Sequence, residues 1–438
     1  MVFGKLAVPL YHKGNAMRVL IVNTSERTGG AAVAANRLMK ALNNHGVKAK
    51  MLVMHKESDS LTVAALPKSP LLHWHFLWER LVIWVNNLFS RKNLFKVSIA
   101  NTGTDITTTK EFKEADIIHL QWINQGFLGL SDIKRILRSG KAIVWTMHDM
   151  WEMTAICHHA YTCTKYETKC QDCPFLALSG KNDLAAYTFN KKQRLLAGQK
   201  ITFVAVSNWL KTRAENSTLL RNFPIAVIPN SISLSHFSKM NRAIARASME
   251  VKEHYVVCFG AARIDDDIKG IKYLIEALHI IYNQRQIESG ELRLLLFGSV
   301  KDKSVLDLIP VNYSYLGTIQ DESTLSRIYA ASNAVVSSSL YETFGQTLIE
   351  AQACGCVPVA FDNSGQTDII KHEVNGYLAT YLSAESLAEG ILWAVKSGIP
   401  YETLRDNVLH NYAEDVVAKQ YIRLYESALG KKTGGYHD

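Results

Sequence analysis

Two glutamates in the second half of the chain have a spacing that lets them bind one polar ligand. Glu342 and Glu350 are separated by seven residues, and the apolar residues 334–336 precede them. The apolar run predicts a buried strand, and residues 344–353 predict the helix that follows it. A strand, a turn at Gly345 and a helix form a cradle for a diphosphate, because the free N–H groups of the helix start point at the anion. With ~100° of rotation per residue, both carboxylates reach a ligand that lies across the helix start.

Two cations flank a second candidate loop, at residues 260–270. Arg263 and Lys269 lie near its ends, and Gly260 and Gly270 bound it. This is the charge pattern expected for neutralising a leaving diphosphate. The acidic residues 265–267 lie between the cations, and we interpret them as a solvated turn rather than as a magnesium site.

A glycine loop, residues 24–32, follows the first predicted strand. Gly29 and Gly30 would let the backbone approach a ligand closely, and the helix that follows would favour a phosphate. The loop lacks the G-x-G-x-x-G spacing of dinucleotide sites. A plain turn between a strand and a helix is the alternative interpretation.

His148 follows a predicted strand at residues 142–146, and open α/β sheets place ligands at such strand ends. A lone histidine is more often structural than functional. His148 is therefore a candidate that needs support from its surroundings.

Four cysteines lie close together in a polar insertion at residues 151–180. Their spacing is C-x5-C-x6-C-x2-C, and they are Cys157, Cys163, Cys170 and Cys173. Tetrahedral thiolate sets favour Zn²⁺, and C-x2-C is the turn that supplies two ligands. Such a zinc would be structural, since four cysteines leave no open position for catalysis. Free thiols and disulfides are the alternatives.

Apolar residues at helical spacing predict a helix over residues 74–88. They are Trp74, Trp78, Leu81, Val85 and Leu88. Three basic residues follow the helix, namely Arg91, Lys92 and Lys96. One interpretation is a helix that packs these side chains against its own domain. The other is an interfacial helix that inserts its aromatic side into a bilayer, with the basic residues on anionic lipid.

Composition and charge limit the class of protein. The chain has 438 residues, of which 47% are hydrophobic and 20% charged, as in ordinary globular proteins. No apolar run is long enough for a membrane span, and the first residues lack a secretory signature, so we expect a cytoplasmic protein. Residues 1–230 carry 30 Lys and Arg against 15 Asp and Glu, whereas residues 231–438 carry 19 against 25. The first half is therefore expected to face an anionic partner.

Strands and helices alternate along the chain, which predicts an α/β fold with parallel sheets. The first series of predicted strands is 18–23, 49–54, 117–121, 142–146 and 201–206, with a helix over 31–43. The pattern breaks near residues 229–230, and residues 231–249 are interpreted as a linker. The second series is 255–260, 292–298, 334–336 and 357–361, and a terminal helix is predicted over 415–429.

These motifs, in this order, resemble the retaining family 4 glycosyltransferases, and the resemblance covers nearly the whole chain. It rests on Gly29-Gly30, His148-Asp149, the cysteine insertion, Ser207-Asn-Trp209, Ile228-Pro-Asn230, Arg263…Lys269-Gly270 and Glu342-x7-Glu350. A departure is Asn230-Ser-Ile-Ser, where family members often have Asn-Gly-Ile-Asp. A similar cysteine insertion occurs in a subgroup linked to surface and capsular polysaccharide synthesis.

The resemblance implies the GT-B fold, with two Rossmann-like domains that face each other across a cleft. The implied division is a tail at 1–16, an acceptor-binding domain at 17–229, a donor-binding domain at 230–414 and, at 415–438, a helix that crosses back to the first domain. The glycine loop would lie near the donor diphosphate and the acceptor.

The resemblance also implies roles for single residues. Glu342 and His148 would contact the donor sugar, and Glu350 the ribose of the nucleotide. Arg263 and Lys269 would hold the phosphates. The backbone near the helix start would also contact the phosphates, at Phe344, Gly345, Gln346 and Thr347. Gly298 and Ile319 would lie near the base. No protein nucleophile and no catalytic metal is expected in this class.

The predicted function is transfer of a hexosyl unit, with retention of configuration, from a UDP- or GDP-sugar to a glycan or lipid-linked acceptor of the cell envelope. Peripheral contact with the inner face of the plasma membrane is expected from the charge and the helix at 74–88. A sugar-nucleotide epimerase on the same fold is the rival enzyme, but it needs acid and base groups that the sequence does not reveal. A nucleic-acid-binding protein is a further alternative; it would interleave aromatic and basic residues on one face, so no nucleic-acid partner is expected.

Overall fold

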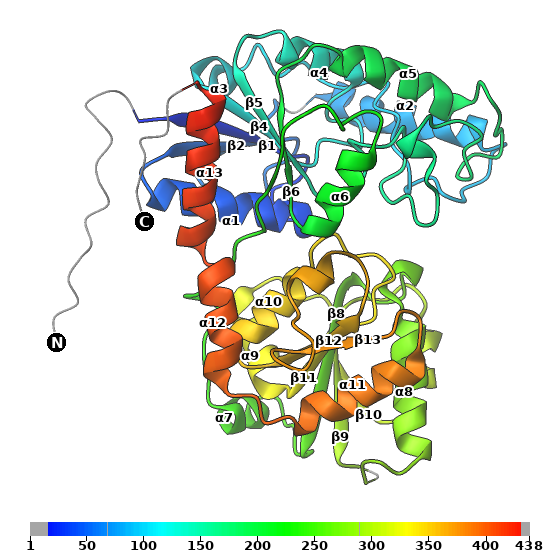
Figure 1. Ribbon diagram of the computed structural model, residues 1–438, viewed down its shortest axis with the longest axis vertical. Coiled ribbons are helices and arrows are strands. Elements are labelled where there is room, and N and C mark those ends of the chain that lie inside the picture. The colour runs from blue at the N-terminus through cyan, green and yellow to red at the C-terminus, as the bar shows by residue number, and fades with distance from the viewer. Residues whose placement is uncertain (1–15, 68, 289, 431–438) are drawn as a thin grey trace.

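The computed structural model describes residues 16–67, 69–288 and 290–430, and they form two α/β domains, one above the other in Figure 1. The GT-B fold predicted from the sequence is confirmed. Apart from Ala16, the predicted tail at 1–16 lies outside the described residues, as does the end of the chain from residue 431.

The first domain holds a seven-stranded parallel sheet in the order β3-β2-β1-β4-β5-β6-β7. Its strands are β1 (Arg18–Val22), β2 (Lys48–Val53), β3 (Val63–Ala65), β4 (Ile117–Leu120), β5 (Ala142–Met147), β6 (Thr202–Ala205) and β7 (Ile225–Val227). Its helices are α1 (Gly30–Asn44), α2 (Pro70–Asn86), α3 (Lys110–Glu114), α4 (Leu130–Leu137), α5 (Leu184–Leu196) and α6 (Asn208–Asn216), with a 3-10 turn η1 (Lys165–Glu167).

The second domain holds a six-stranded parallel sheet in the order β10-β9-β8-β11-β12-β13. Its strands are β8 (Tyr255–Arg263), β9 (Leu292–Ser299), β10 (Asn312–Tyr315), β11 (Ala334–Ser337), β12 (Val357–Phe361) and β13 (Tyr377–Ala379). Its helices are α7 (Arg242–Ala247), α8 (Ile271–Asn283), α9 (Glu322–Ala331), α10 (Gln346–Ala353), α11 (Ala384–Lys396) and α12 (Tyr401–Asn411). The 3-10 turns are η2 (Asp267–Lys269), η3 (Lys303–Leu308) and η4 (Ser364–Asp368).

The central strands form where the sequence has continuous apolar runs, because parallel strands are covered by helices on both faces. All four residues of β4 are buried, and so are all five of β12. The sheets fall on either side of residues 229–230. Part of the predicted linker at 231–249 is helical, since Asn241 caps α7 by accepting hydrogen bonds from the N–H groups of Ala243 and Ile244.

The last helix, α13 (Glu414–Ala428), returns to the first domain and packs along α1 and β5 (Figure 1). Two buried tyrosines attach it there. The hydroxyl of Tyr425 lies 2.7 Å from Nδ1 of His119, and that of Tyr421 lies 3.0 Å from Oγ1 of Thr146. The predicted crossover helix is therefore present, and it joins the two domains.

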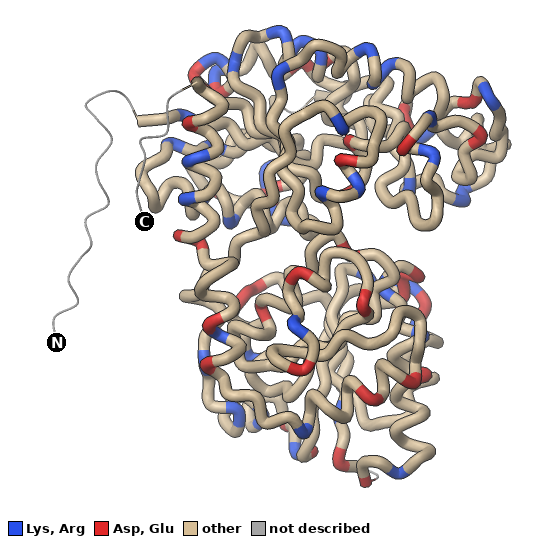
Figure 2. Tube along the Cα trace, viewed as in Figure 1, with Lys and Arg blue, Asp and Glu red and all other residues tan. Residues whose placement is uncertain are grey.

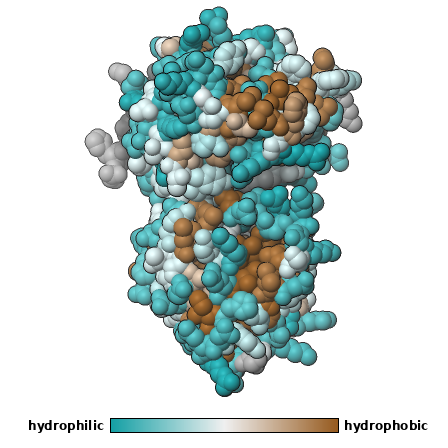
Figure 3. Space-filling view, turned by 90° about the vertical axis from the view of Figure 1, so that its right-hand side faces the viewer, coloured by the Kyte–Doolittle hydropathy of each residue, from teal (hydrophilic) through white to brown (hydrophobic). Residues whose placement is uncertain are grey.

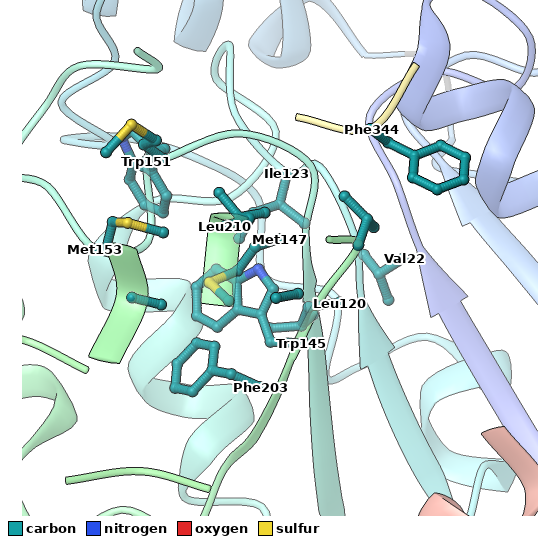
Figure 4. Packing of buried hydrophobic residues seen from close by; sticks show 14 of the residues in the cluster. Val22, Leu120, Ile123, Trp145, Met147, Trp151, Met153, Phe203, Leu210 and Phe344 are labelled. Atoms are coloured by element: carbon teal, nitrogen blue, oxygen red, sulfur yellow. The ribbon is translucent and has the colours of Figure 1, made fainter. Parts of the chain in front are cut away.

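One hydrophobic cluster extends across the domain boundary (Figure 4). It contains Val22 and Ile123 of the first domain together with Phe344, which directly follows the Glu342 loop of the second. The ring of Phe344 also packs against Tyr412, with 5.7 Å between centroids. This shared core fixes the candidate ligand loops of the two domains relative to each other.

Candidate functional site

The predicted ligand residues come together where the two domains meet. The loops that carry them follow the carboxyl ends of β1, β5, β8 and β11. Two hydrogen bonds join these loops across the boundary: Oγ1 of Thr343 donates to the carbonyl of His148 over 2.8 Å, and Nε2 of Gln346 donates to the carbonyl of Gly30 over 3.3 Å. Ligands bind at such strand ends in open α/β sheets.

Two helix starts face each other at this boundary. Helix α1 begins at Gly30 after Gly29, and α10 begins at Gln346 after Gly345. Gly29 and Gly345 have φ values of 92° and 108°, which favour glycine. Neither helix start has a side-chain cap, and a Cβ at Gly29 or Gly30 would meet nothing within 4 Å. The bond from Gln346 to Gly30 brings the two helix starts close together, and their uncapped N–H groups suit a diphosphate.

Lys269 and Glu342 form an ion pair beside these helix starts. Nζ of Lys269 lies 2.7 Å from Oε2 of Glu342, and the side chains are 28% and 23% exposed. The N–H of Glu342 donates to Oγ of Ser364, and its carbonyl accepts the N–H of Gly365. Both backbone groups of Glu342 are therefore hydrogen-bonded, while the side chains of Lys269 and Glu342 stay partly exposed to solvent.

Arg263 is turned toward its own loop. Its Nη2 lies 2.9 Å from Oδ2 of Asp266, and its Nε lies 3.7 Å from Asp265. Asp265 also accepts N–H groups from Lys301 and Asp302, so this acid organises two adjacent loops. The acidic residues therefore have a structural role, and a phosphate would compete with Asp266 for the guanidinium.

Glu350 is buried and engages residues that the sequence analysis did not select. Its Oε1 accepts a 2.8 Å bond from Nη2 of Arg37, and its Oε2 accepts a 3.0 Å bond from the hydroxyl of Tyr329. Arg37 comes from α1 of the opposite domain. An arginine between the buried Ala35 and Leu38 was the signal that could have revealed it, because buried arginines need partners.

His148 lies at the end of β5 as predicted and is half-buried. Its Nε2 donates to Oε1 of Gln121 over 2.6 Å, which leaves Nδ1 as an acceptor. Burial lowers the pKa of His148 to about 4, so the ring is neutral at neutral pH. Nε2 of Gln121 in turn donates to His119, which is bonded to Tyr425 of α13. A buried polar chain thus connects the crossover helix to His148, and no motif in the sequence indicates it.

Asp149 links the loop after β4 to the cysteine insertion by hydrogen bonds. Its Oδ2 accepts bonds of 2.7 Å from both Nε1 of Trp122 and Nδ1 of His158. Burial acts to raise the pKa of Asp149, but His158 and the hydrogen bonds lower it to about 2. His159 follows His158, and the centroid of its ring lies 6.1 Å from that of Tyr341. The buried Nδ1 of His159 has no hydrogen-bond partner among the described residues. The cysteine insertion therefore reaches the residue that precedes Glu342.

The four insertion cysteines are free thiols, and Cys157 and Cys173 are buried. Burial raises the pKa of Cys170 to about 11 and that of Cys173 to about 12, while the N–H of Phe175 acts on Cys173 in the opposite direction. The donor set suits zinc chemically. Within residues 16–67, 69–288 and 290–430, no three His, Cys, Asp or Glu side chains are placed as a metal-binding group. Zinc at this insertion stays a prediction.

Gly298 is the next-to-last residue of β9, and Ile319 lies in the loop that follows β10. Gly298 has a φ of 132°, and a Cβ there would lie 1.8 Å from the carbonyl oxygen of Ala261. The close approach of β8 thus explains this glycine without a ligand. Ile319 is half-buried against the large hydrophobic cluster. Their contact with a base stays a prediction.

Helix α2 contacts its domain with a different face from the one its apolar spacing suggests. Glu79 and Arg80 are buried, and Glu79 accepts the N–H groups of Ile99 and Ala100. The apolar stripe is exposed instead, with Trp74 at 62% and Trp78 at 50%. The interpretation that this stripe packs on its own domain is therefore wrong. Glu79 and Arg80 take the buried positions because their side chains satisfy backbone groups of the adjacent segment.

Family models match both halves of the chain. The one described as Glycosyltransferase Family 4 matches residues 28–236, and the one described as Glycosyl transferases group 1 matches residues 241–411. With the fold, these two matches identify the chain as a protein of the GT-B glycosyltransferase class.

Several curated proteins are similar to it. An uncharacterized glycosyltransferase of Methanocaldococcus jannaschii is 30% identical over 209 residues, which are 45% of this chain and 51% of that protein. A phosphatidyl-myo-inositol mannosyltransferase of Mycobacterium tuberculosis is 24% identical, over 46% of this chain and 54% of that protein. An uncharacterized 41.2 kDa protein in the cps region of Klebsiella pneumoniae is 22% identical, over 78% of this chain and 87% of that protein. The chain spans about half the length of the first two relatives.

Solved structures share the fold over nearly the whole chain. Sucrose-phosphate synthase from Thermosynechococcus elongatus has a TM-score of 0.66 and 18% identity, covering 94% of this chain and 99% of that one. Anabaena HepE, in complex with UDP and glucose, has a TM-score of 0.61 and 16% identity, covering 94% of this chain and 100% of that one. At these identities the similarity concerns the fold alone.

Proposed function

We propose that this protein is a retaining, metal-independent glycosyltransferase that transfers a hexose from a UDP- or GDP-sugar to a glycan or lipid-linked acceptor of the cell envelope. One observation carries the proposal: the uncapped starts of α1 and α10 converge beside the Lys269–Glu342 pair. N–H groups and a lysine fit a diphosphate, and a carboxylate next to them fits the hydroxyls of the attached sugar.

The residues divide the work as follows. Lys269 and the N–H groups of Gln346 and Thr347 stabilise the diphosphate as its bond to the sugar breaks. Arg263 joins them once phosphate oxygens replace Asp266. Glu342 and the neutral ring of His148 orient the sugar hydroxyls. An oxygen of the leaving diphosphate takes the proton of the acceptor hydroxyl on the same face, so the anomeric configuration is retained without a protein nucleophile.

The relatives support the envelope part of the proposal. The Klebsiella protein is named for the cps region, and the mycobacterial relative is named as a transferase that acts on phosphatidyl-myo-inositol. HepE was crystallised with UDP and glucose, which supports a uridine nucleotide as the first donor to try. The same family matches favour a transferase over the epimerase alternative.

The proposal is tested by calorimetric titration of the full-length protein with UDP, GDP, ADP and their common sugar conjugates. One-site binding of a single nucleotide family is expected, and it should be lost in Glu350→Ala. With the donor known, proton NMR of the first product distinguishes an α from a β linkage. Inversion relative to the donor, or absence of binding to every nucleotide, would contradict the proposal.

We also propose that α2 places the enzyme on the inner face of the plasma membrane by docking to anionic lipid. The exposed apolar side chains of α2 and the segment after it form a continuous surface on the first domain, and Figure 3 shows an apolar patch there. Its members are Leu71, Trp74, Leu77, Trp78, Leu81, Val85, Leu88, Phe89 and Phe95. A shallow groove of about 380 Å³ runs along it.

The basic residues around this apolar patch indicate an anionic lipid surface as its partner. Arg91, Lys92 and Lys96 are exposed beside it, and Figure 2 shows Lys and Arg frequent over the first domain. The first 230 residues carry a net charge of +15, from 30 basic and 15 acidic residues. Apolar side chains bordered by cations fit an anionic bilayer surface better than a neutral one. No helix in the described part of the chain is both long and apolar enough to span the bilayer.

Sedimentation with vesicles tests the docking. The protein should sediment with phosphatidylglycerol vesicles and far less with phosphatidylcholine ones. The double variant Trp74→Gln/Trp78→Gln should stay in solution. Tyr282→Gln, which removes an exposed aromatic from the second domain, is the matched control and should bind as the wild type does. Equal sedimentation of the double variant and the wild type would refute the assignment of α2.

We propose, finally, that the insertion binds one structural zinc through Cys157, Cys163, Cys170 and Cys173. The four free thiols in one segment and the N–H of Phe175 beside Cys173 support this. Mass spectrometry of the native protein should show one bound zinc, which Cys170→Ser loses and Cys258→Ser keeps. A metal-free protein, or a mass two hydrogens lighter from a disulfide, would exclude zinc.

A further inference from the structure

Arg37 belongs to α1 of the first domain, yet its guanidinium bonds two carboxylates of the second. Nη2 lies 2.8 Å from Oε1 of Glu350, and Nη2 and Nε lie 2.8 and 3.0 Å from Oε1 of Glu322. The side chains of Arg37 and Glu350 are 5% and 7% exposed. A cation that crosses a domain boundary to reach a buried carboxylate is costly to desolvate, so its position calls for an explanation.

The carboxylate of Glu350 is oriented from two sides. Arg37 donates to Oε1, and the hydroxyl of Tyr329 donates to Oε2 over 3.0 Å. A carboxylate oxygen accepts two hydrogen bonds, so each oxygen keeps capacity for one further donor. The ring of Phe237 lies under the guanidinium, 5.3 Å from its carbon, and limits its movement. Glu350 is thus held in one orientation, and each of its oxygens has capacity for one further hydroxyl, as two neighbouring ligand hydroxyls require.

We propose that Arg37 is a positioning residue that holds the carboxylate of Glu350 oriented for the vicinal hydroxyls of a nucleotide's ribose. The inference rests on the proposed function, in which Glu350 binds that ribose. It adds that recognition of the ribose depends on a side chain of the domain that does not bind the nucleotide. Because Arg37 reaches Glu350 across the domain boundary, the carboxylate that binds the ribose is oriented only when the two domains are in contact.

The competing explanation is that Arg37 is only a structural clamp, which ties the two domains together through Glu322 and Glu350. A variant of Glu322 distinguishes this explanation from positioning. Glu322 shares the guanidinium with Glu350, and its other oxygen lies 3.1 Å from Nδ1 of His236. Glu322→Gln removes the charge of this partner and leaves the bond between Arg37 and Glu350. A clamp predicts that Arg37→Gln and Glu322→Gln act alike on every ligand. Positioning predicts that only Arg37→Gln changes the response to ribose hydroxyls.

The experiment measures dissociation constants by calorimetry for the full-length protein with UDP and with 2′,3′-dideoxy-UDP, or with the guanosine pair if GDP is the ligand. The wild type should bind the ribose form at least about tenfold more tightly, since hydrogen bonds to a charged acceptor are worth that much. In Arg37→Gln the ratio should fall below about threefold, with the affinity for the dideoxy form retained. Glu322→Gln should keep the wild-type ratio.

Arg37→Lys provides a second variant if Arg37→Gln does not fold, as judged by its melting transition. Lysine keeps the charge but not the fork, so it should give an intermediate ratio. An unchanged ratio in both Arg37 variants, or an equal loss of affinity for both nucleotides, would overturn the inference while leaving the proposed function intact. A wild type that binds no nucleotide would overturn the proposed function itself, and this inference with it.

Discussion

Removal of Lys269 should abolish sugar transfer and leave the protein folded. In the structure Nζ of Lys269 lies 2.7 Å from Oε2 of Glu342, in the loop that precedes α10. In the proposed reaction this cation neutralises the diphosphate as it leaves. Lys269→Ala therefore deletes one charge at the place where negative charge develops.

The two consequences of that deletion differ in size. Both side chains are more than a fifth exposed, so the pair adds about 1 kcal/mol or less to the free energy of unfolding. A lysine and a phosphate oxygen ~4 Å apart, at an effective dielectric constant of ~20, interact by about 4 kcal/mol. Loss of that interaction in the transition state corresponds to a fall of about 10³ in kcat/KM. The catalytic effect should exceed the effect on stability several-fold.

The assay is release of the nucleoside diphosphate from the donor that titration identifies, measured beside a thermal melt. Lys239→Ala is the matched control, because its Nζ pairs with Glu402 at 3.3 Å on the exposed surface of the second domain. The control should keep both activity and melting temperature. Retention of more than about a tenth of kcat/KM in Lys269→Ala would refute the charge argument. A large drop in its melting temperature would show that the pair is structural.

Three further predictions concern stability. His119 is fully buried, and burial lowers its pKa to about 3. Below about pH 6.5 the unfolded chain therefore binds a proton at His119, whereas the folded chain does not. The free energy of unfolding should fall as the pH drops below 6.5, and His119 should contribute about 2 kcal/mol of this fall at pH 5. Denaturant titrations at several pH values should show this slope reduced in His119→Asn, and an equal slope would contradict it. Gly298→Ala should cost more than about 2 kcal/mol, because its Cβ would lie 1.8 Å from the oxygen of Ala261, whereas Gly140→Ala, with nothing within 4 Å, should cost about 1; equal costs in urea unfolding would be inconsistent with this packing. Tyr425→Phe should cost about 1 kcal/mol by losing its bond to His119, and a neutral result would mean that the hydroxyl adds nothing to the attachment of α13.

Much of the fold could be predicted because periodicity and burial agree in the central strands. The predicted strands at 18–23, 117–121 and 357–361 match β1, β4 and β12 closely, since each is an apolar run covered on both faces. The edge strands β3, β7, β10 and β13 were not predicted. They are short, and most of their residues are not buried, so they lack that signal.

The partners of the candidate residues were harder to predict than the residues themselves. The sequence predicted that Arg263 and Lys269 bind one diphosphate, but it did not predict that Arg263 bonds Asp266 and Lys269 bonds Glu342. It also left open whether the tryptophans of α2 pack on the domain or face outward, and the structure exposes them because the backbone contacts of Glu79 bring that side chain to the domain. Ion pairs and buried hydrogen bonds depend on which loops meet in space, and no spacing within one segment encodes that.

The features that can be predicted from the sequence are local ones. Glycine turns before helices, apolar strands and the seven residues between Glu342 and Glu350 are properties of short segments, whose geometry follows from backbone sterics and helical periodicity. Folding of the whole chain is needed to bring Arg37 of the first domain to Glu350 of the second, and to link Tyr425 of the last helix to His148 through His119 and Gln121. These contacts join residues that are distant along the chain, so they exist only after a hydrophobic core shared by both domains and a crossing helix have fixed the domains against each other.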